Sequence, residues 1–179
     1  GRTEDSRPHA FVDMDGELAF FEACKSLIEL GHKRIALING EQEYMFPIFC
    51  LEGYRKGLKS GGLTFVPELV KEWKPQDMHL NGYEHTLALM SLEQPPTAIL
   101  FHTGIASGIL QALREINLTV GRDVSLISYD DLEIAKTNNP QLTVMRPPGK
   151  NAGEKLVEML MEVIDGRSPE LLHQIWQAE

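Results

Sequence analysis

The sequence has few cysteines and no long apolar run. Two cysteines, Cys24 and Cys50, stand in 179 residues. That is too few for a disulfide framework, so we expect two reduced thiols. No uninterrupted apolar run reaches the roughly 18 residues that a membrane span needs, and the first residues show no signal peptide. These absences predict a cytoplasmic protein that makes no membrane contact.

Positive charge is also scarce. The formal net charge is -9, and the densest basic spots are the pairs Lys33–Arg34 and Arg55–Lys56. A surface that binds duplex DNA needs many cations to displace counterions, so we do not expect this segment by itself to bind nucleic acid. Hydrophobic residues make up 42% and charged residues 24%, which is typical of a globular chain. We expect one domain over residues 1–179.

Signatures of enzymes and metal sites are missing as well. The sequence contains no G-x-G-x-x-G dinucleotide loop and no Gly-Lys-Ser/Thr phosphate loop. The nearest approach to a nucleophile elbow is 104–108, where Ser107 falls inside a predicted helix. His79 and His85 are six positions apart, and neither cysteine has a CxxC neighbour. We therefore expect no catalytic residue, no metal and no cofactor, and we favour binding over catalysis.

Short apolar runs alternate with amphipathic helical patterns along the chain. Strands are predicted at 10–13, 34–38, 69–70, 97–101, 124–129, 142–145 and 171–176. Helices are predicted at 18–30, 47–60, 79–92, 104–116, 132–137 and 152–163, and residues 41–46 and 71–78 are predicted to be loops. This alternation predicts an α/β fold with an open, mostly parallel sheet that is covered by helices on both faces.

Candidate binding residues follow the predicted strands. In open parallel sheets, ligands bind beyond the carboxyl ends of the strands. The residues found there are Phe46, Trp73, His102, Thr103 and Asp130. A sugar ring has an apolar face that stacks on aromatic rings and a rim of hydroxyls that bind carboxylates and other polar groups. The strand ends therefore favour a site for a small sugar-like ligand.

Each candidate also has a purely structural alternative. One of Asp130 and Asp131 is expected to cap the short helix that follows, and the other to contact ligand. Trp73 is equally consistent with ordinary packing, and Phe46 with a hydrophobic staple at a helix entry. His102 reads as a loop histidine with satisfied hydrogen bonds rather than as a catalytic base.

Several stretches resemble the lactose-repressor (LacI/GalR) family of transcriptional regulators in order and spacing. They are Leu27–Ile38 (similar to LIELGHRRIAFI), Leu51–Arg55 (R-x-x-G-Y), Pro96–Ile99 (PTAI), Val120–Asp131 (V-P-x-D-V-S-x-I-G-Y-D-D) and Pro140–Val144 (P-x-L-T-T-V). The resemblance covers nearly the whole chain. It implies most of the C-terminal lobe of an effector domain built like a periplasmic sugar-binding protein, with a Rossmann- or flavodoxin-like sheet.

The resemblance also implies what lies outside these residues. Members of the family carry a helix-turn-helix headpiece that binds operator DNA, and a small effector binds between two lobes of the sensor. By this alignment the chain begins near the crossover between the lobes, so the headpiece and most of the first lobe are expected to lie outside it. Operator DNA is then a partner only through that headpiece.

Residue roles carried over from the family fall on the same strand ends. Asp130 matches the family's ligand-contacting aspartate, Phe46 lies in a loop that contributes to the pocket, and Trp73 matches an aromatic pocket residue. His102 and Thr103 replace the usual Asn-Asp pair. Cys50 stands where the family has an arginine that clamps sugar hydroxyls. Because a forked cationic donor is lost there, we expect an effector other than a plain monosaccharide held by that arginine.

The expected function is effector sensing by a repressor of this family. A homodimer is expected, with the helix at 104–116 and the segment near Pro140 as its face. The alternative is a periplasmic-type sugar-binding protein for transport, which shares the architecture. A third hypothesis, an enzyme with a flavodoxin-like sheet, has the least support because no catalytic motif is present.

Overall fold

The computed structural model describes residues 1–3 and 7–179. Its main unit is a parallel sheet of five strands in the order β3-β2-β4-β5-β6. The strands are β2 (Ile35–Gly40), β3 (Val70–Trp73), β4 (Ala98–His102), β5 (Ser125–Tyr129) and β6 (Thr143–Met145). The helices of this unit are α1 (Gly16–Glu29), α2 (Met45–Ser60), α3 (Met78–Met90), α4 (Ala106–Glu115) and α5 (Glu133–Thr137).

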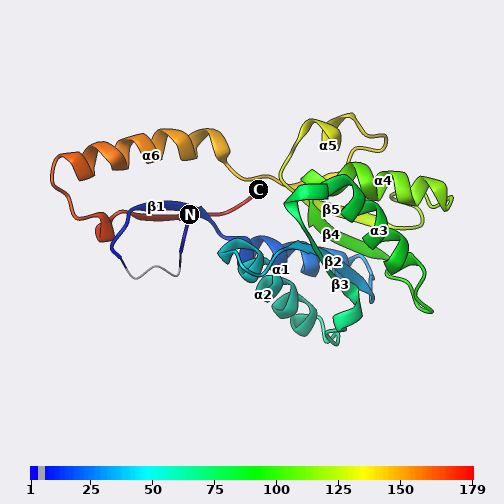
Figure 1. Cartoon of the computed structure of the whole chain (residues 1–179). Coiled ribbons are helices and arrows are strands. Elements are labelled where there is room, and N and C mark those ends of the chain that lie inside the picture. The colour runs from blue at the N-terminus through cyan, green and yellow to red at the C-terminus, as the bar shows by residue number, and fades with distance from the viewer. Residues whose placement is uncertain (4–6) are drawn as a thin grey trace.

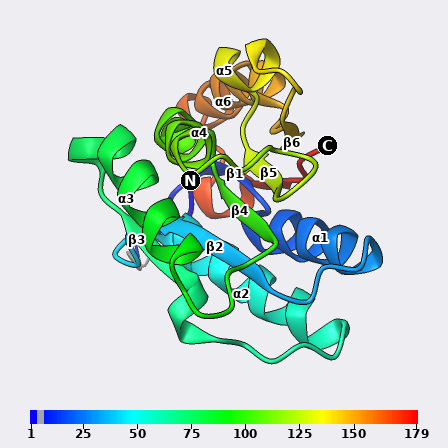
Figure 2. The same ribbon diagram turned by 90° about the vertical axis from the view of Figure 1, so that its right-hand side faces the viewer.

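Helices cover both faces of the sheet, as the sequence predicts (Figure 2). Alternate strand residues point to opposite faces, so each face has its own core. On one face Leu37 and Leu100 pack with residues of α1 and α2. On the other face Ile99 and Phe101 pack with residues of α3 and α4, including Ile109. Strands that are buried on both faces carry continuous apolar runs instead of alternation, which is the pattern seen from Ile35 to Ile38.

A smaller unit extends away from this sheet (Figure 1). Strands β1 (Phe11–Met14) and β7 (His173–Trp176) form a parallel two-stranded sheet, and α6 (Gly149–Ile164) packs on it. Its core consists of Val12, Met159 and Leu172. The chain enters the five-stranded unit directly after β1 and leaves it after β6, so the two units are joined by short crossing segments.

Helices α1 and α2 lie unusually close together on their shared face of the sheet. A Cβ atom at Gly53 would lie 2.1 Å from the main-chain oxygen of Glu17, so only glycine permits this approach. At the start of α1, the carboxylate of Asp15 accepts a hydrogen bond from the backbone N–H of Leu18 at 3.0 Å, which confirms the predicted N-cap.

Two predicted boundaries are wrong near the candidate site. The loop predicted at 71–78 is instead the continuation of β3 through Trp73, a 3₁₀ turn at Pro75–Asp77 and the start of α3. Lys71 and Glu72 are polar, but they pair with Ile38 and Asn39 of β2 at the sheet edge, where polar side chains are tolerated. Helix α2 starts at Met45, so Phe46 lies in its first turn and not in the preceding loop.

Candidate functional site

The register of the parallel strands brings four strand ends to one edge of the sheet. Gly40, at the end of β2, pairs with Trp73, at the end of β3. His102, at the end of β4, pairs with Tyr129, at the end of β5. The first turn of α2 lies against the same edge, because the buried amide of Asn39 donates to the carbonyl oxygen of Pro47 at 2.8 Å.

Phe46, Trp73, His102 and Tyr129 lie at this edge, and we call these four residues the aromatic cluster. A further ring, that of Phe20 in α1, has no exposed surface and lies 6.0 Å from His102. The ring of Phe46 lies 4.9 Å from Tyr129 and 5.6 Å from His102, between centroids. His102 lies 5.5 Å from Tyr129 and 6.0 Å edge-on from Trp73. The structure therefore brings together three residues proposed from the sequence and adds a fourth, Tyr129.

Two buried polar atoms of the cluster lack partners among the residues that the structure describes. They are Nε1 of Trp73, which is a donor, and Nε2 of His102. Burial lowers the pKa of His102 to about 4, so its imidazole is neutral near pH 7 and carries one donor and one acceptor. The expectation of a loop histidine with satisfied hydrogen bonds is wrong, because His102 ends β4 and its Nε2 is unpaired.

Asp130 directly follows the cluster in a strained backbone conformation. Its φ angle is 80°, a left-handed value that L-residues adopt rarely and that favours Asn, Asp and Gly. The buried hydroxyl of Thr103 donates to the carbonyl oxygen of Tyr129 at 2.7 Å and also contacts the carbonyl oxygen of Asp130. Thr103 therefore fixes the turn that carries Asp130, and its hydroxyl is already engaged within the protein.

Asp131 neither caps α5 nor is free to contact a ligand, the two roles predicted for this pair of aspartates, because it forms ion pairs. Its carboxylate pairs with Nε of Arg146 at 2.8 Å and with Nζ of Lys136 at 3.2 Å. The N-cap of α5 is Leu132, which makes no side-chain capping bond. The expectation that one of the two aspartates caps this helix is therefore wrong. Asp130 uses one oxygen to accept the backbone N–H of Asp131 at 2.8 Å.

Cys50 lies beneath the aromatic cluster and has no exposed surface. Its Sγ is 3.2 Å from the position that a Cβ of Gly16 would occupy, and the ring of Phe46 fills the space on the same side. Burial raises the pKa of the Cys50 thiol far above its usual range, so the group is neutral and behaves as an apolar side chain. Cys24 is likewise a free, buried thiol.

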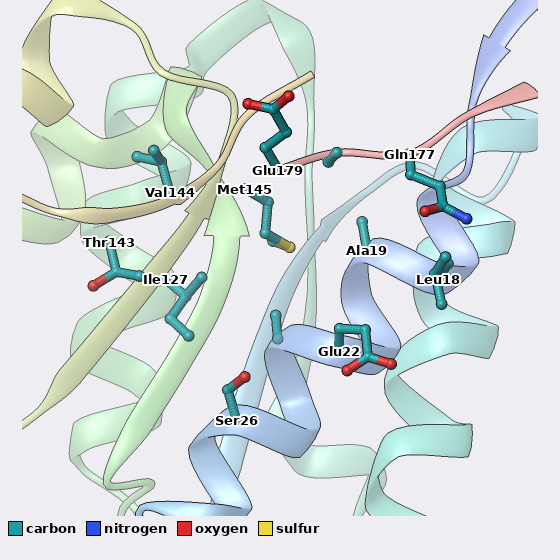
Figure 3. Close-up of a pocket in the computed structure, with 12 residues that line it drawn as sticks. Leu18, Ala19, Glu22, Ser26, Ile127, Thr143, Val144, Met145, Gln177 and Glu179 are labelled. Atoms are coloured by element: carbon teal, nitrogen blue, oxygen red, sulfur yellow. The ribbon is translucent and has the colours of Figure 1, made fainter. Parts of the chain in front are cut away.

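A separate cavity of about 300 Å³ lies between α1 and the edge strand β6, beside the last residues of the chain (Figure 3). Its polar side chains, such as Glu22, Ser26 and Thr143, are all exposed. Main-chain hydrogen bonds between Arg146 and Glu179 close one side. No aromatic ring lines it, so it does not offer the stacking surface found at the strand ends.

Metal ligands and membrane spans are both absent from the described ranges 1–3 and 7–179. No group of three or more His, Cys, Asp or Glu side chains is placed to hold a metal ion. Within the same ranges, no helix is long and apolar enough to cross a membrane.

The fold and the placement of the site define a class of protein. A parallel lobe with polar and aromatic groups at its carboxyl edge, joined by short crossings to a second unit, is the architecture of periplasmic binding proteins. The sequence pattern of the periplasmic binding protein-like domain matches residues 24–175. The chain therefore belongs to this family, and its relatives are transcriptional regulators of the LacI type, as the sequence motifs indicate.

Three similar proteins illustrate the relationship. The HTH-type transcriptional regulator AglR of Rhizobium meliloti (strain 1021) is 36% identical, and the match covers 97% of this chain and 49% of that protein. A LacI-family regulatory protein from Chloroflexus aggregans superimposes with a TM-score of 0.92 at 31% identity, covering 100% of this chain and 64% of that one. The transcriptional regulator CelR, in complex with cellobiose, superimposes with a TM-score of 0.89 at 25% identity. This match covers 98% of this chain and 53% of the CelR chain.

The chain thus spans about half the length of the AglR relative that it matches. These relatives are regulators and not transport proteins or enzymes, so the comparisons favour the regulator hypothesis over the transport alternative.

Proposed function

We propose that this chain is the effector-sensing part of a LacI-family DNA-binding regulator. The main support for this proposal is the aromatic cluster at the carboxyl edge of the sheet, with Asp130 held beside it. Flat rings supply a stacking surface for the apolar face of a sugar, and a fixed carboxylate accepts hydrogen bonds from its hydroxyls. That cellobiose is bound by the similar regulator CelR supports a sugar-like effector here.

Each candidate residue has a distinct role in this proposal. Phe46, Trp73 and His102 contact the effector. A hydroxyl group of the effector accepts a hydrogen bond from Nε1 of Trp73 and donates one to Nε2 of His102. Asp130 binds further hydroxyls. Thr103 positions Asp130. Cys50 shapes the site from beneath Phe46, because its thiol has no exposed surface.

The proposal covers the wider protein as well. Residues 1–179 are then one effector-binding and dimerisation unit, mainly the C-terminal lobe, and the effector is enclosed between this lobe and the first one. Effector binding favours one arrangement of the lobes and so changes operator affinity by linkage. Operator DNA is bound by a headpiece outside these residues, the protein is cytoplasmic and homodimeric, and no catalytic activity is required.

Binding of saccharides to the protein that contains residues 1–179 tests this function. We expect calorimetry to detect cellobiose or another saccharide of a small panel, and Asp130→Asn to weaken that binding roughly tenfold or more, because a charge-assisted hydrogen bond is lost. Asp123→Asn is the matched control: its carboxylate lies near the opposite end of β5, in a pair with Arg122.

Equal saccharide affinity in the Asp130 and Asp123 variants would remove Asp130 from the site. Failure of every saccharide to bind the unmodified protein would contradict sugar sensing itself.

A further inference from the structure

The two units of the chain are joined by crossing segments and not by a shared core. Among the described residues, the buried clusters that pack on the five-stranded sheet have no member in common with the cluster of Val12, Met159 and Leu172 in the smaller unit. Figure 1 shows the smaller unit extending away from the sheet. A shared core would fix the orientation of the units by close packing, so here the orientation depends on contacts at the crossings.

Main-chain hydrogen bonds hold these crossings side by side. The N–H of Asp15, between β1 and α1, donates to the carbonyl oxygen of Trp176 at 2.7 Å. Arg146, after β6, and Glu179, after β7, exchange two bonds of 2.7 and 2.9 Å. These bonds run from one crossing to the next. The backbone dihedral angles of the crossings can therefore still change, as they do at the joints of other two-lobed proteins.

The side chain of Arg2 contacts both units at once. On the smaller unit, its Nε donates to Oδ2 of Asp13 at 2.6 Å, and its Nη2 donates to the carbonyl oxygen of Met14 at 3.2 Å, both in β1. On the five-stranded unit, the central carbon of its guanidinium lies 3.7 Å from the centroid of the Phe49 ring in α2. The guanidinium therefore bridges β1 and α2.

This bridge is partly shielded from solvent. The side chains of Arg2 and Asp13 are 22% and 14% exposed, and Phe49 is half-buried. Ion pairs in full contact with water contribute little, whereas a cation–π contact strengthens as its groups lose water. A planar guanidinium stacks on a ring with its face and donates hydrogen bonds along its edge. One group can therefore hold two surfaces in a defined orientation.

We propose that Arg2 forms a brace between the two units and fixes the orientation of the smaller unit relative to the sheet. Asp13 and Met14 hold the guanidinium on β1, and Phe49 receives its face on α2. The orientation of the lobes is the variable through which the proposed function changes operator affinity. The regulatory meaning of the brace rests on that function, whereas the brace itself does not.

Distances between two spin labels test the brace in the absence of any ligand. The labels are attached to the protein that contains residues 1–179, at Lys59→Cys near the end of α2 and Glu154→Cys on α6, which are both exposed positions. Cys24 and Cys50 have no exposed surface and are not expected to react. Pulsed electron paramagnetic resonance then gives the distribution of separations between α2 and α6.

Three variants separate the parts of the brace. Arg2→Ala should raise the population of separations other than the main one by roughly twofold to thirtyfold, the equilibrium factor that corresponds to a cation–π contact. Phe49→Leu should have a similar effect, because leucine keeps an apolar side chain but removes the ring, while the bonds from Arg2 to β1 remain. The double variant should show no further increase, since the two side chains form one contact.

Arg55→Ala is the matched control. Its guanidinium carbon lies 4.7 Å from the centroid of the Phe65 ring, so it forms the same kind of contact, but both residues belong to the five-stranded unit. Its loss should leave the distribution of separations unchanged.

Three outcomes would overturn the proposal. If Arg2→Ala lowers the melting temperature but leaves the distribution unchanged, Arg2 stabilises the fold without bracing the joint. If Phe49→Leu leaves the distribution unchanged while Arg2→Ala alters it, the bridge to α2 is wrong. If Arg55→Ala alters it equally, the change reports general destabilisation. Because no saccharide is present, a failure of saccharide binding would contradict the proposed function and leave the result on the brace standing.

Discussion

At the scale of single residues, the structure separates side chains of the same type by their surroundings. Asp130 and Asp131 are neighbours, yet Asp131 is paired with two cations while Asp130 sits in a left-handed turn beside aromatic rings. His32 and His102 differ in the same way. His32 contacts the hydroxyls of Thr97 and Ser125 through its two ring nitrogens, whereas Nε2 of His102 is buried without a partner in the described ranges.

The burial of His102 should make the stability of the protein depend on pH. Its pKa falls from 6.5 to about 4 on folding, so the unfolded chain binds a proton more readily. Stability contributed by neutral His102 is complete above about pH 6.5 and is lost as the pH falls towards about 4, by up to roughly 3 kcal/mol. Chemical denaturation at pH 7 and pH 4.5 should show a larger loss for the unmodified protein than for His102→Phe.

His32, whose pKa is also lowered by burial, is present in both proteins and cancels in this comparison. If the free energy of unfolding falls by the same amount between pH 7 and pH 4.5 in the unmodified protein and in His102→Phe, the pKa of His102 is not lowered by folding.

At the scale of elements, glycines set how closely the covering helices approach. In the pair α3 and α4, a Cβ at Gly108 would lie 1.9 Å from the main-chain oxygen of His79 and 2.6 Å from the nitrogen of Tyr83. Backbone atoms cannot move aside as a flexible side chain does. The contact between these helices therefore depends on the absence of a side chain at this position.

Gly108→Ala should destabilise the protein by about 1–3 kcal/mol or more, because the two helices must separate. Gly153→Ala in α6 is the matched control: a Cβ there meets nothing within 4 Å, so the higher helix propensity of alanine should leave stability unchanged or raise it by up to about 1 kcal/mol. Urea denaturation measures both. Equal effects of the two substitutions would contradict the close approach of α3 and α4.

Helix α6 shows a different relation between pattern and packing. The sequence predicts an apolar face that includes Leu156, Met159 and Leu160. Only Met159 of these is buried, while Leu156 and Leu160 are 48% and 57% exposed. The two strands β1 and β7 offer too little surface to cover the whole apolar stripe of α6. The apolar stripe is therefore wider than the part of the helix that packs on these strands.

At the scale of the whole molecule, the proposed homodimer uses a surface remote from the effector site. Helix α4 and the segment Asn138–Pro140 line one groove, together with Leu118 and Val120. Light scattering should give the protein twice its chain mass. Thr119→Arg, at an exposed position that lines this groove, should shift it towards the monomer, because an added charge and bulk disfavour a packed interface.

Ser26→Arg is the matched control, since Ser26 is also a solvent-facing residue and lies on α1, which covers the other face of the sheet. A dimer that survives Thr119→Arg would show that the face lies elsewhere.

Most of the fold was accessible from the sequence because its signals are local. Asp15 caps α1 as predicted, and Gly31 follows that helix with a φ of 96°, a conformation that glycine tolerates. The buried strands at Ile35 and Ala98 appear as apolar runs. The extent of β3 was missed because edge strands carry polar residues such as Lys71 and Glu72, which look like a loop.

The sequence by itself determined the order of strands and helices along the chain and the class of sheet, and therefore the edge at which we propose that the effector binds. It placed Phe46, Trp73, His102 and Asp130 near that edge through the strands that precede them. Only the tertiary structure decided which side chains meet there. Tyr129 joins the aromatic cluster through the register of β4 and β5. Arg2 and Asp13 meet across eleven positions of chain, because contacts between distant residues depend on packing, which no local pattern encodes.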